Sequence, residues 1–340
     1  MKRVLGFIFT LLVVGGLIYI IKDINFYELY LILAEAKLNW IVLSFLATFM
    51  TFIIWNLRVV LIFRHYMPIE FLFSLKVLFA GAFFNTVTPG AGVGGEPFRA
   101  HFFAKRYNKP TTKVLGYVLG DTFFRIMVLL ALTVFSILFV LVYVKISSNL
   151  RLIFEGILVG VFLIVFFTVL FLLKKSHFRI GTFFRKLHRF KFISKRFVSE
   201  DHFVSYINKR IGNLTGVFKE VAKNKEHWVF GVILSVVFWG LNILSAYFLF
   251  LAFYQDVNFL SVVIVFTLGN IIGSFTPIPG GIGVTEGSMT LLYSAMGVFF
   301  PLALLVAFLQ RMFYYFFSLV VGGWCLVNLR KINSEKNGFF

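Results

Sequence analysis

Long apolar runs constrain this chain's fold more than any other feature of its sequence. Two of the clearest, Leu129–Val144 and Leu158–Leu173, contain no charged residue. A helix needs about 20 predominantly apolar residues to cross a bilayer, and only helices and closed barrels satisfy every backbone polar group in hydrocarbon. Barrel strands alternate apolar and polar residues over about ten positions, and these runs do not alternate. The sequence therefore predicts an all-α integral membrane protein.

The predicted membrane domain occupies the whole chain, residues 1–340. Hydrophobic residues make up 60% of it and charged residues 14%, whereas about a quarter of a soluble domain is charged. The net charge of +19 does not indicate a nucleic-acid partner, because the basic residues flank the apolar runs. Six segments are long enough to be full spans: Val4–Ile21, Trp40–Phe63, Val114–Val144, Leu152–Leu173, Trp228–Phe253 and Leu302–Leu329.

The distribution of basic residues predicts the orientation of these spans. Residues 174–226 carry 14 Lys or Arg and 4 Asp or Glu, and the positive-inside rule places such a segment in the cytoplasm. The same rule places both termini there. The basic segment is also open to a second interpretation, an amphipathic helix lying on anionic lipid.

Two further apolar stretches are interrupted by glycine and proline. Phe71–Thr88 resumes after the break as Pro97–Tyr107, and Phe259–Phe275 resumes as Gly287–Val298. Treating each stretch as a re-entrant helical hairpin keeps all the strongly basic segments on the cytoplasmic side. The first hairpin then enters from the cytoplasm and the second from outside.

The two interruptions resemble each other. Pro89–Glu96 aligns without gaps on Pro279–Glu286 at an offset of 190 residues, matching the proline, the first glycine and the glutamate. We therefore predict two inverted repeats, residues 40–144 and 228–329. Inverted repeats whose broken helices meet near the bilayer midplane are a recurring transporter plan. Tight packing turns without a transport role are the alternative interpretation.

The glycine loops are the first part of the predicted binding site. Exposed loop N–H groups beside a helix start form an anion site, and a lipid phosphate is the expected anion. Glu96 and Glu286 are expected either to cap their helices or to bind a headgroup amine. The loop residues assigned to this site are Pro89, Gly90, Gly92, Gly94, Gly95, Pro279, Gly280, Gly281 and Gly283.

Charged residues within the spans are the second part, because charge at such depth is costly and usually functional. Asp121 and Arg125 are four residues apart on one predicted helix and are expected to pair. Arg58 is expected to extend to the cytoplasmic surface. We expect one central cavity to collect five charged residues, with a purely structural salt-bridge cluster as the alternative: Glu96, Asp121, Arg125, Glu286 and Arg311. Arg99, Asn85 and Asn270 are expected to support the same site.

These paired motifs, Pro89–Glu96 followed by Arg99 and Pro279–Glu286, resemble the lysylphosphatidylglycerol synthase transmembrane, or flippase-like, family. That family includes the membrane domain of multiple-peptide-resistance factors. The resemblance implies a flippase that moves aminoacylated phosphatidylglycerol between leaflets. Full-length members of that type carry a soluble aminoacyltransferase domain after the membrane part. This sequence ends at Phe340, and we therefore expect that the chain does not synthesise aminoacyl lipid itself.

The predicted function is translocation of a phospholipid or another lipid-linked substrate between leaflets of a bacterial or archaeal cytoplasmic membrane. The partners expected are anionic or aminoacylated phospholipids or polyprenyl-linked lipids, with a lipid synthase or a second copy of the chain as further candidates. No enzyme motif, cofactor or metal site is expected. Two alternatives stay open: a membrane-embedded lipid-modifying transferase using Glu96 or Asp121 as general base, and a scaffold for a lipid synthase.

Overall fold

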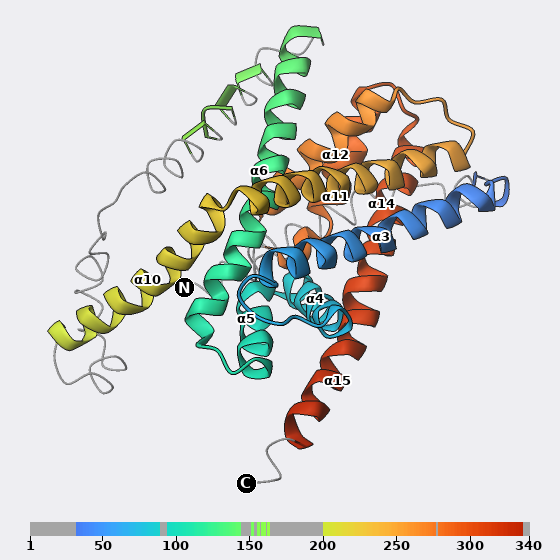
Figure 1. Cartoon of the computed structure of the whole chain (residues 1–340). Coiled ribbons are helices and arrows are strands. Elements are labelled where there is room, and N and C mark those ends of the chain that lie inside the picture. The colour runs from blue at the N-terminus through green and yellow to red at the C-terminus, as the bar shows by residue number, and fades with distance from the viewer. Residues whose placement is uncertain are drawn as a thin grey trace, which may run out of the picture.

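The computed structural model describes residues 32–88, 94–143, 200–276 and 278–335, with a few short stretches between 151 and 163. Every regular element within these ranges is a helix (Figure 1). The prediction of an all-helical protein is confirmed for this part of the chain.

Four of the helical segments are long and apolar enough to cross a membrane. They are α3 (Leu38–Phe63), α6 (Thr111–Tyr143), α11 (Lys225–Ala252) and Phe300–Leu329. The last combines α14 (Phe300–Tyr315), the π-helical segment η3 (Phe316–Val321) and most of α15 (Gly322–Glu335). At about 1.5 Å per residue, the shortest of them exceeds the roughly 30 Å hydrocarbon core. Four predicted spans thus coincide with these segments.

The other two predicted spans are not placed. Val4–Ile21 lies outside the described residues, and so does most of Leu152–Leu173. The described residues accordingly support four candidate spans out of the six predicted.

The predicted hairpin segments form two pairs of shorter helices. The first pair is α4 (Phe71–Val87) and α5 (Gly95–Arg106), and the second is α12 (Phe259–Ser274) and α13 (Val284–Ala295). A short 3-10 turn, η2, covers Pro279–Gly281 between α12 and α13. Within each pair the two helices pack against each other. The proline and glycine clusters therefore end the apolar helices where the sequence predicts.

Asparagine side chains cap the starts of two helices, α11 and α12. Asn224 Oδ1 accepts hydrogen bonds from the backbone N–H groups of Glu226 and His227 at the start of α11. Asn258 Oδ1 accepts from the N–H of Leu260 at the start of α12. Such caps satisfy N–H groups that have no partner within the helix, and they fix where each apolar run enters its helix.

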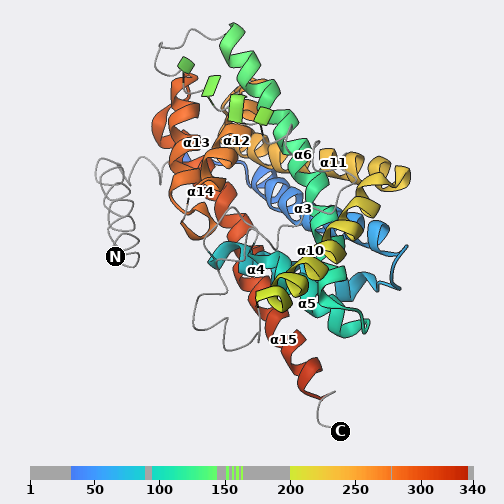
Figure 2. The ribbon, with the colours of Figure 1, turned by 90° about the vertical axis from the view of Figure 1, so that its left-hand side faces the viewer.

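The long helices α3 and α11 pack side by side, and α6 crosses them (Figure 1). The α4–α5 pair lies toward the lower end of the molecule and the α12–α13 pair toward the upper end, in both views (Figures 1 and 2). Each pair has its own hydrophobic core. Phe52, Phe79 and Phe103 belong to the first core, and Phe250, Met289 and Tyr293 to the second.

Residues 200–223 of the predicted basic segment form the helix α10 (Glu200–Lys223), while residues 174–199 lie outside the described part. The C-terminal half of α10 packs against α6. A Cβ added at Gly116 or Gly120 of α6 would collide with Val217 or Val221. One face of α10 is therefore held by protein, through the small residues that let two helices approach closely.

Candidate functional site

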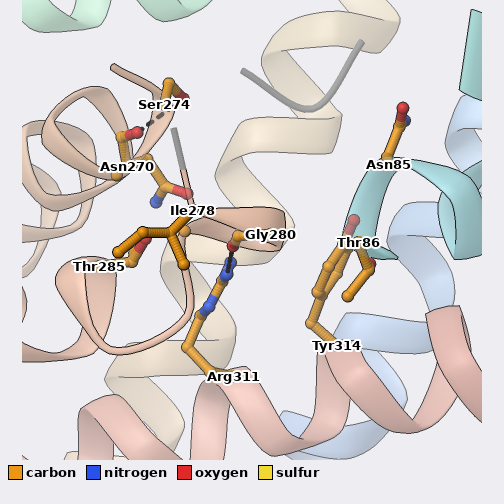
Figure 3. A pocket seen from close by; sticks show the side chains of 11 residues that line it. Asn85, Thr86, Asn270, Ser274, Ile278, Gly280, Thr285, Arg311 and Tyr314 are labelled. Carbon is orange, nitrogen blue, oxygen red and sulfur yellow. Dashed lines mark hydrogen bonds between the residues drawn. The ribbon is translucent and has the colours of Figure 1, made fainter. Parts of the chain in front are cut away.

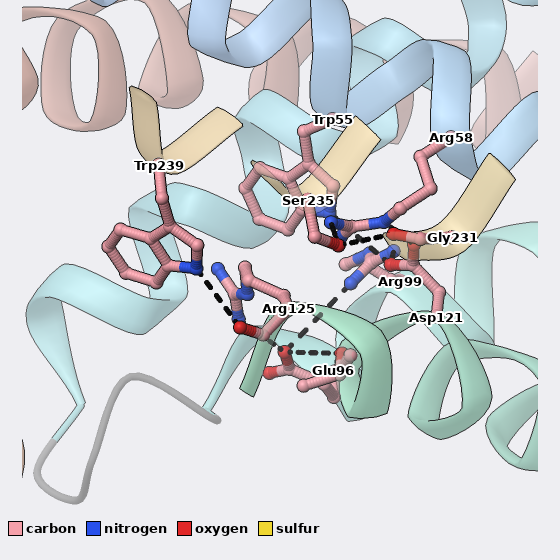
Figure 4. Close-up of polar contacts among 10 residues, drawn as sticks. Trp55, Arg58, Glu96, Arg99, Asp121, Arg125, Gly231, Ser235 and Trp239 are labelled. Atoms are coloured by element: carbon pink, nitrogen blue, oxygen red, sulfur yellow. Dashed lines mark hydrogen bonds and ion pairs between the residues drawn. The ribbon is translucent and has the colours of Figure 1, made fainter. Parts of the chain in front are cut away.

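Asp121 of α6 is the centre of a buried ion-pair cluster (Figure 4). Its Oδ1 accepts from Nε of Arg58 at 2.7 Å, and its Oδ2 accepts from Nη2 of Arg99 at 2.9 Å. Nε1 of Trp55 also donates to Oδ2, at 3.3 Å. The Arg58, Arg99 and Asp121 side chains are fully buried. Because Arg58 belongs to α3 and Arg99 to α5, the carboxylate links three helices.

The structure corrects two expectations about this cluster. Arg58 does not extend to the surface: it is buried, and its Nη1 donates to Oγ of Ser235 on α11 at 2.8 Å. The expected Asp121–Arg125 pair does not form among the described contacts. The reason is that guanidinium groups from two other helices already hold the Asp121 carboxylate.

Arg125 pairs instead with Glu96, at the start of α5 (Figure 4). Its Nη2 lies 3.6 Å from Oε1 of Glu96. The same oxygen accepts from Oγ1 of Thr122 at 3.3 Å and lies 3.9 Å from Nη1 of Arg99. Oε2 of Glu96 is buried without a hydrogen-bond partner. The Arg125 guanidinium also lies over the Trp55 ring, 4.9 Å from its centroid.

Glu286, the matching glutamate of the second hairpin, has a different set of partners. Its Oε2 accepts from the backbone N–H of Gly283 at 2.7 Å, so this carboxylate caps α13. Its Oε1 accepts from Nε of Arg311 at 3.2 Å and from the Tyr315 hydroxyl at 2.7 Å. Arg311 Nη2 donates to the Gly280 carbonyl at 2.6 Å. The capping interpretation therefore holds for Glu286.

The turn between α12 and α13 requires glycine at the positions that make these contacts. Gly280 has φ of 63° and Gly283 has φ of 83°, values that side-chain-bearing residues rarely adopt. This backbone turns the Gly280 carbonyl toward Arg311 and the Gly283 N–H toward Glu286. The backbone of the second glycine motif thus binds one arginine and one glutamate side chain of the same protein.

A cavity of about 340 Å³ lies between the two halves of the chain. Arg125 of α6 and Arg311 of α14 both line it, and α3, α4, α11 and α12 contribute the remaining walls. A smaller cavity of about 110 Å³ continues toward η2 and shares Asn85, Asn270 and Arg311 (Figure 3). In Figure 3, Arg311 extends toward Gly280 on one side, and Asn85 and Thr86 lie on the opposite side.

Comparison with known sequences identifies the family once this geometry is in view. Residues 4–322 match the lysylphosphatidylglycerol synthase transmembrane region. The chain belongs to this family. The resemblance predicted from the paired glycine motifs is therefore confirmed.

The relatives are archaeal membrane proteins. A UPF0104 membrane protein of Pyrococcus horikoshii is 28% identical over 305 residues, covering 88% of this chain and 90% of the relative. A UPF0104 membrane protein of Methanocaldococcus jannaschii is 25% identical over 348 residues, covering 98% of this chain and 96% of the relative. Together with the four candidate spans, these matches identify a multi-pass membrane protein.

Within this family member, the predicted site residues fall into two groups. Four of them line the larger cavity: Asn85, Arg125, Asn270 and Arg311. Four others are held in ion pairs or hydrogen bonds and do not line either cavity: Glu96, Arg99, Asp121 and Glu286. The five charged residues expected in one central cavity are therefore divided, and only the two arginines reach it.

The predicted glycine loops are partly visible. Pro89, Gly90 and Gly92 lie outside the described residues. Gly94 precedes α5, and the N–H of Gly95 donates to Oδ1 of Asn85 at 2.6 Å, as expected for an asparagine beside the loop. Asn270 differs, because its Nδ2 donates to the Phe266 carbonyl in its own helix. In the second loop, Gly280 and Gly281 line the smaller cavity together with Ile278.

Several residues of the site escaped the sequence interpretation. Trp239 lines the larger cavity, and its Nε1 donates to the Arg125 carbonyl at 3.0 Å. Gln310, another lining residue, donates to the Asn242 carbonyl at 2.9 Å. One signal was present for Tyr315: it stands 190 residues after Arg125, the same offset that relates the two glutamates.

Proposed function

We propose that this chain moves a phospholipid or another lipid-linked substrate between the two leaflets of the membrane, with the headgroup held in the larger cavity. The observation that most strongly supports this proposal is that one arginine from each half of the chain lines the cavity, Arg125 from the first half and Arg311 from the second. Their side chains keep 17% and 14% exposure, in contrast to the fully buried Arg58 and Arg99. Cationic groups are thus available at a depth where charge is usually functional.

The rest of the cavity wall suits an amphiphile. Amide side chains of Asn85, Asn242 and Gln310 supply polar groups, while Leu129, Phe238 and their apolar neighbours supply the remainder. A lipid headgroup with the start of its chains presents the same division of polar and apolar surface. A volume of about 340 Å³ is at the lower end of the range for ligand pockets, so it fits a headgroup rather than a whole lipid.

The proposal includes two re-entrant hairpins in inverted repeats, and local packing supports it. Gly81 of α4 packs against the Arg99 stem, and Gly269 of α12 packs against Met289 in the corresponding place. The contact between Asn85 and Gly95 likewise has a counterpart between Gly273 and Thr285.

The offsets in these pairs are consistent. The partners in α5 and α13 are related by 190 residues, and those in α4 and α12 by 188. The second connection is therefore two residues longer than the first. Both hairpins also use a helix of similar length on each side, 17 and 12 residues in the first and 16 and 12 in the second.

The proposed arrangement in the membrane completes the translocator. Six spans cross the cytoplasmic membrane, both termini and the basic segment 174–226 face the cytoplasm, and the hairpins enter from opposite sides. Rocking of one repeat against the other would open the cavity to each leaflet in turn. The chain performs no covalent chemistry in this proposal.

Reconstitution into liposomes tests the function. Fluorescent phosphatidylglycerol would be placed in both leaflets, and an impermeant reductant would bleach the outer-leaflet label, with and without an imposed ion gradient. We expect the purified chain to expose inner-leaflet label to the reductant. Arg125→Gln and Arg311→Gln should abolish this exposure, because each removes a headgroup cation while retaining a hydrogen-bonding side chain.

Arg106→Gln is the matched control. Arg106 pairs with Glu70 at 2.8 Å at the protein surface and lines neither cavity, so its loss should leave translocation unchanged. Protected inner-leaflet label under every gradient would refute the proposed function. Full translocation by both cavity variants would remove the cavity from the mechanism.

A further inference from the structure

We infer that the headgroup taken by this chain is a net-negative phosphate without an amine, rather than an aminoacylated headgroup. The inference rests on the proposed function and adds the substrate class. Its basis is the charge of the larger cavity: the described residues that line it include Arg125 and Arg311 and no carboxylate. An ammonium group in that cavity would meet two like charges and no acceptor of opposite sign.

The buried cluster behind Arg125 leaves a surplus positive charge. Three guanidinium groups, those of Arg58, Arg99 and Arg125, face two carboxylates, those of Asp121 and Glu96. Arg58 and Arg99 lie within 2.9 Å of Asp121, whereas Arg125 approaches Glu96 only to 3.6 Å. The cluster therefore carries one net positive charge, and Arg125 is the member that reaches the cavity.

An unbalanced charge of this kind is costly away from water. Within the described residues, the Arg125 side chain donates no hydrogen bond to protein, and the one ion pair it makes is the 3.6 Å contact with Oε1 of Glu96. A phosphate oxygen in the cavity would supply both the missing charge and the missing acceptor.

Arg311 provides a second cation with spare donor capacity. Its Nε and Nη2 are used by Glu286, Gly280 and Tyr315. Nη1 makes no hydrogen bond within the described part of the chain and is not among the buried unpartnered atoms. One side of this guanidinium is thus held by the second hairpin while the other is open to a ligand.

Neither Glu96 nor Glu286 is among the residues that line the two cavities. Glu286 uses one oxygen to cap α13 and the other to hold Arg311 and Tyr315. Glu96 is 1% exposed, and its Oε1 faces three polar side chains of its own hairpin and of α6 while its Oε2 is buried without a hydrogen-bond partner. Because neither glutamate lines either of these two cavities, the expectation that they bind a headgroup amine lacks support in this geometry.

The neutral polar groups of the cavity indicate what accompanies the phosphate. Asn85, Asn242, Asn270 and Gln310 all line it. The amide N–H groups of Asn242, Asn270 and Gln310 already donate to backbone carbonyls. Their amide oxygens are uncharged acceptors, which suits hydroxyl groups such as those of glycerol or a sugar. The substrate class is therefore an anionic lipid phosphate, alone or bearing a hydroxylated headgroup.

Lipid binding to the purified chain in detergent tests this inference. Native mass spectrometry would compare retention of four lipids: phosphatidylglycerol, a polyprenyl phosphate, phosphatidylcholine and lysyl-phosphatidylglycerol. We expect both anionic lipids to be retained about tenfold more tightly than the lysylated one, the ratio that corresponds to one charge-assisted hydrogen bond. Whichever anionic lipid is tighter identifies the source of the phosphate.

Arg125→Gln should reduce this preference about tenfold, and Arg106→Gln should leave it unchanged. Equal or tighter binding of the lysylated lipid by the unmodified chain would overturn the inference, and this comparison needs no variant to fold. Detergent contains no leaflets, so selectivity for anionic lipids without translocation would refute only the proposed function. Translocation without selectivity would refute only the inference.

Discussion

The two glutamate hairpins share a packing plan but differ in electrostatics. Glu96 and Glu286 each stand in the first turn of the second helix of a hairpin. Glu286 binds back to its own helix start and forms a neutral pair with Arg311. Glu96 forms no such cap and turns toward the arginines of α5 and α6. The same motif therefore serves a self-contained balanced pair in one half and a positively charged cluster in the other.

The two copies of the glycine motif therefore have different roles, which the sequence of the motif alone does not distinguish. In the first half, the buried ion pairs and hydrogen bonds of Asp121 and Arg58 join α3, α5, α6 and α11. Arg125 is the charged residue of this half that reaches the cavity. The second half holds Arg311 at the cavity through a glycine turn. The difference between the two helix pairs, α4–α5 and α12–α13, in how their charges are balanced is what gives the cavity its net positive character.

The largest expected effect on stability comes from removing the negative charge of Asp121, the carboxylate at the centre of the buried ion-pair cluster. Asp121→Asn leaves Arg58 and Arg99 buried without a carboxylate, so we expect a loss of about 3–5 kcal/mol in unfolding free energy. Denaturation of the detergent-purified protein, followed by tryptophan fluorescence, would measure the loss. Glu70→Gln is the control, because its pair with Arg106 is exposed and should contribute at most about 1 kcal/mol. Equal losses of unfolding free energy in the two variants would contradict a stabilising role for the Asp121 ion pairs.

A smaller change in stability is expected from the difference in packing between the two hairpins. An added Cβ at Gly95 would collide with the Gly81 carbonyl and Asn85, whereas the matching position of the second hairpin is Thr285. Gly95→Ala should therefore destabilise the protein by about 1–3 kcal/mol through overpacking, as measured in the same denaturation experiment.

Gly287→Ala, a glycine-to-alanine change at an open position of the second hairpin, is the control. Gly287 lies in α13 with open space where its Cβ would be, so alanine should be neutral or stabilise the helix by up to about 1 kcal/mol. If Gly95→Ala proved as well tolerated as Gly287→Ala, the close approach of α4 and α5 would be wrong.

Helix positions in this chain were predictable from sequence because a membrane imposes a simple requirement on apolar length. Trp40–Phe63 was predicted and Leu38–Phe63 is observed; Val114–Val144 was predicted and Thr111–Tyr143 is observed. The glycine-proline breaks were equally readable, since proline and glycine end helices through their own backbone chemistry.

The partners of the charged side chains were not predictable in the same way. Arg58 meets Asp121 across 63 positions of sequence and Ser235 across 177. A spacing rule within one helix proposed Arg125 for Asp121, but tertiary packing brought two closer guanidiniums from α3 and α5. Which charges face the cavity depends on these long-range contacts, so the division between Arg125 and Asp121 required the structure.

The opposite entry of the two hairpins is the central claim, because alternating access depends on it. Single cysteines at Leu72, Lys109, Asn258 and Phe299, all exposed positions, would be introduced into a Cys325→Ser background and labelled in intact cells with an impermeant maleimide. Our account predicts that Asn258 and Phe299 variants label in intact cells, whereas Leu72 and Lys109 variants label only after permeabilisation. Labelling of the two ends of either hairpin from opposite sides, or of both hairpins from the same side, would contradict it.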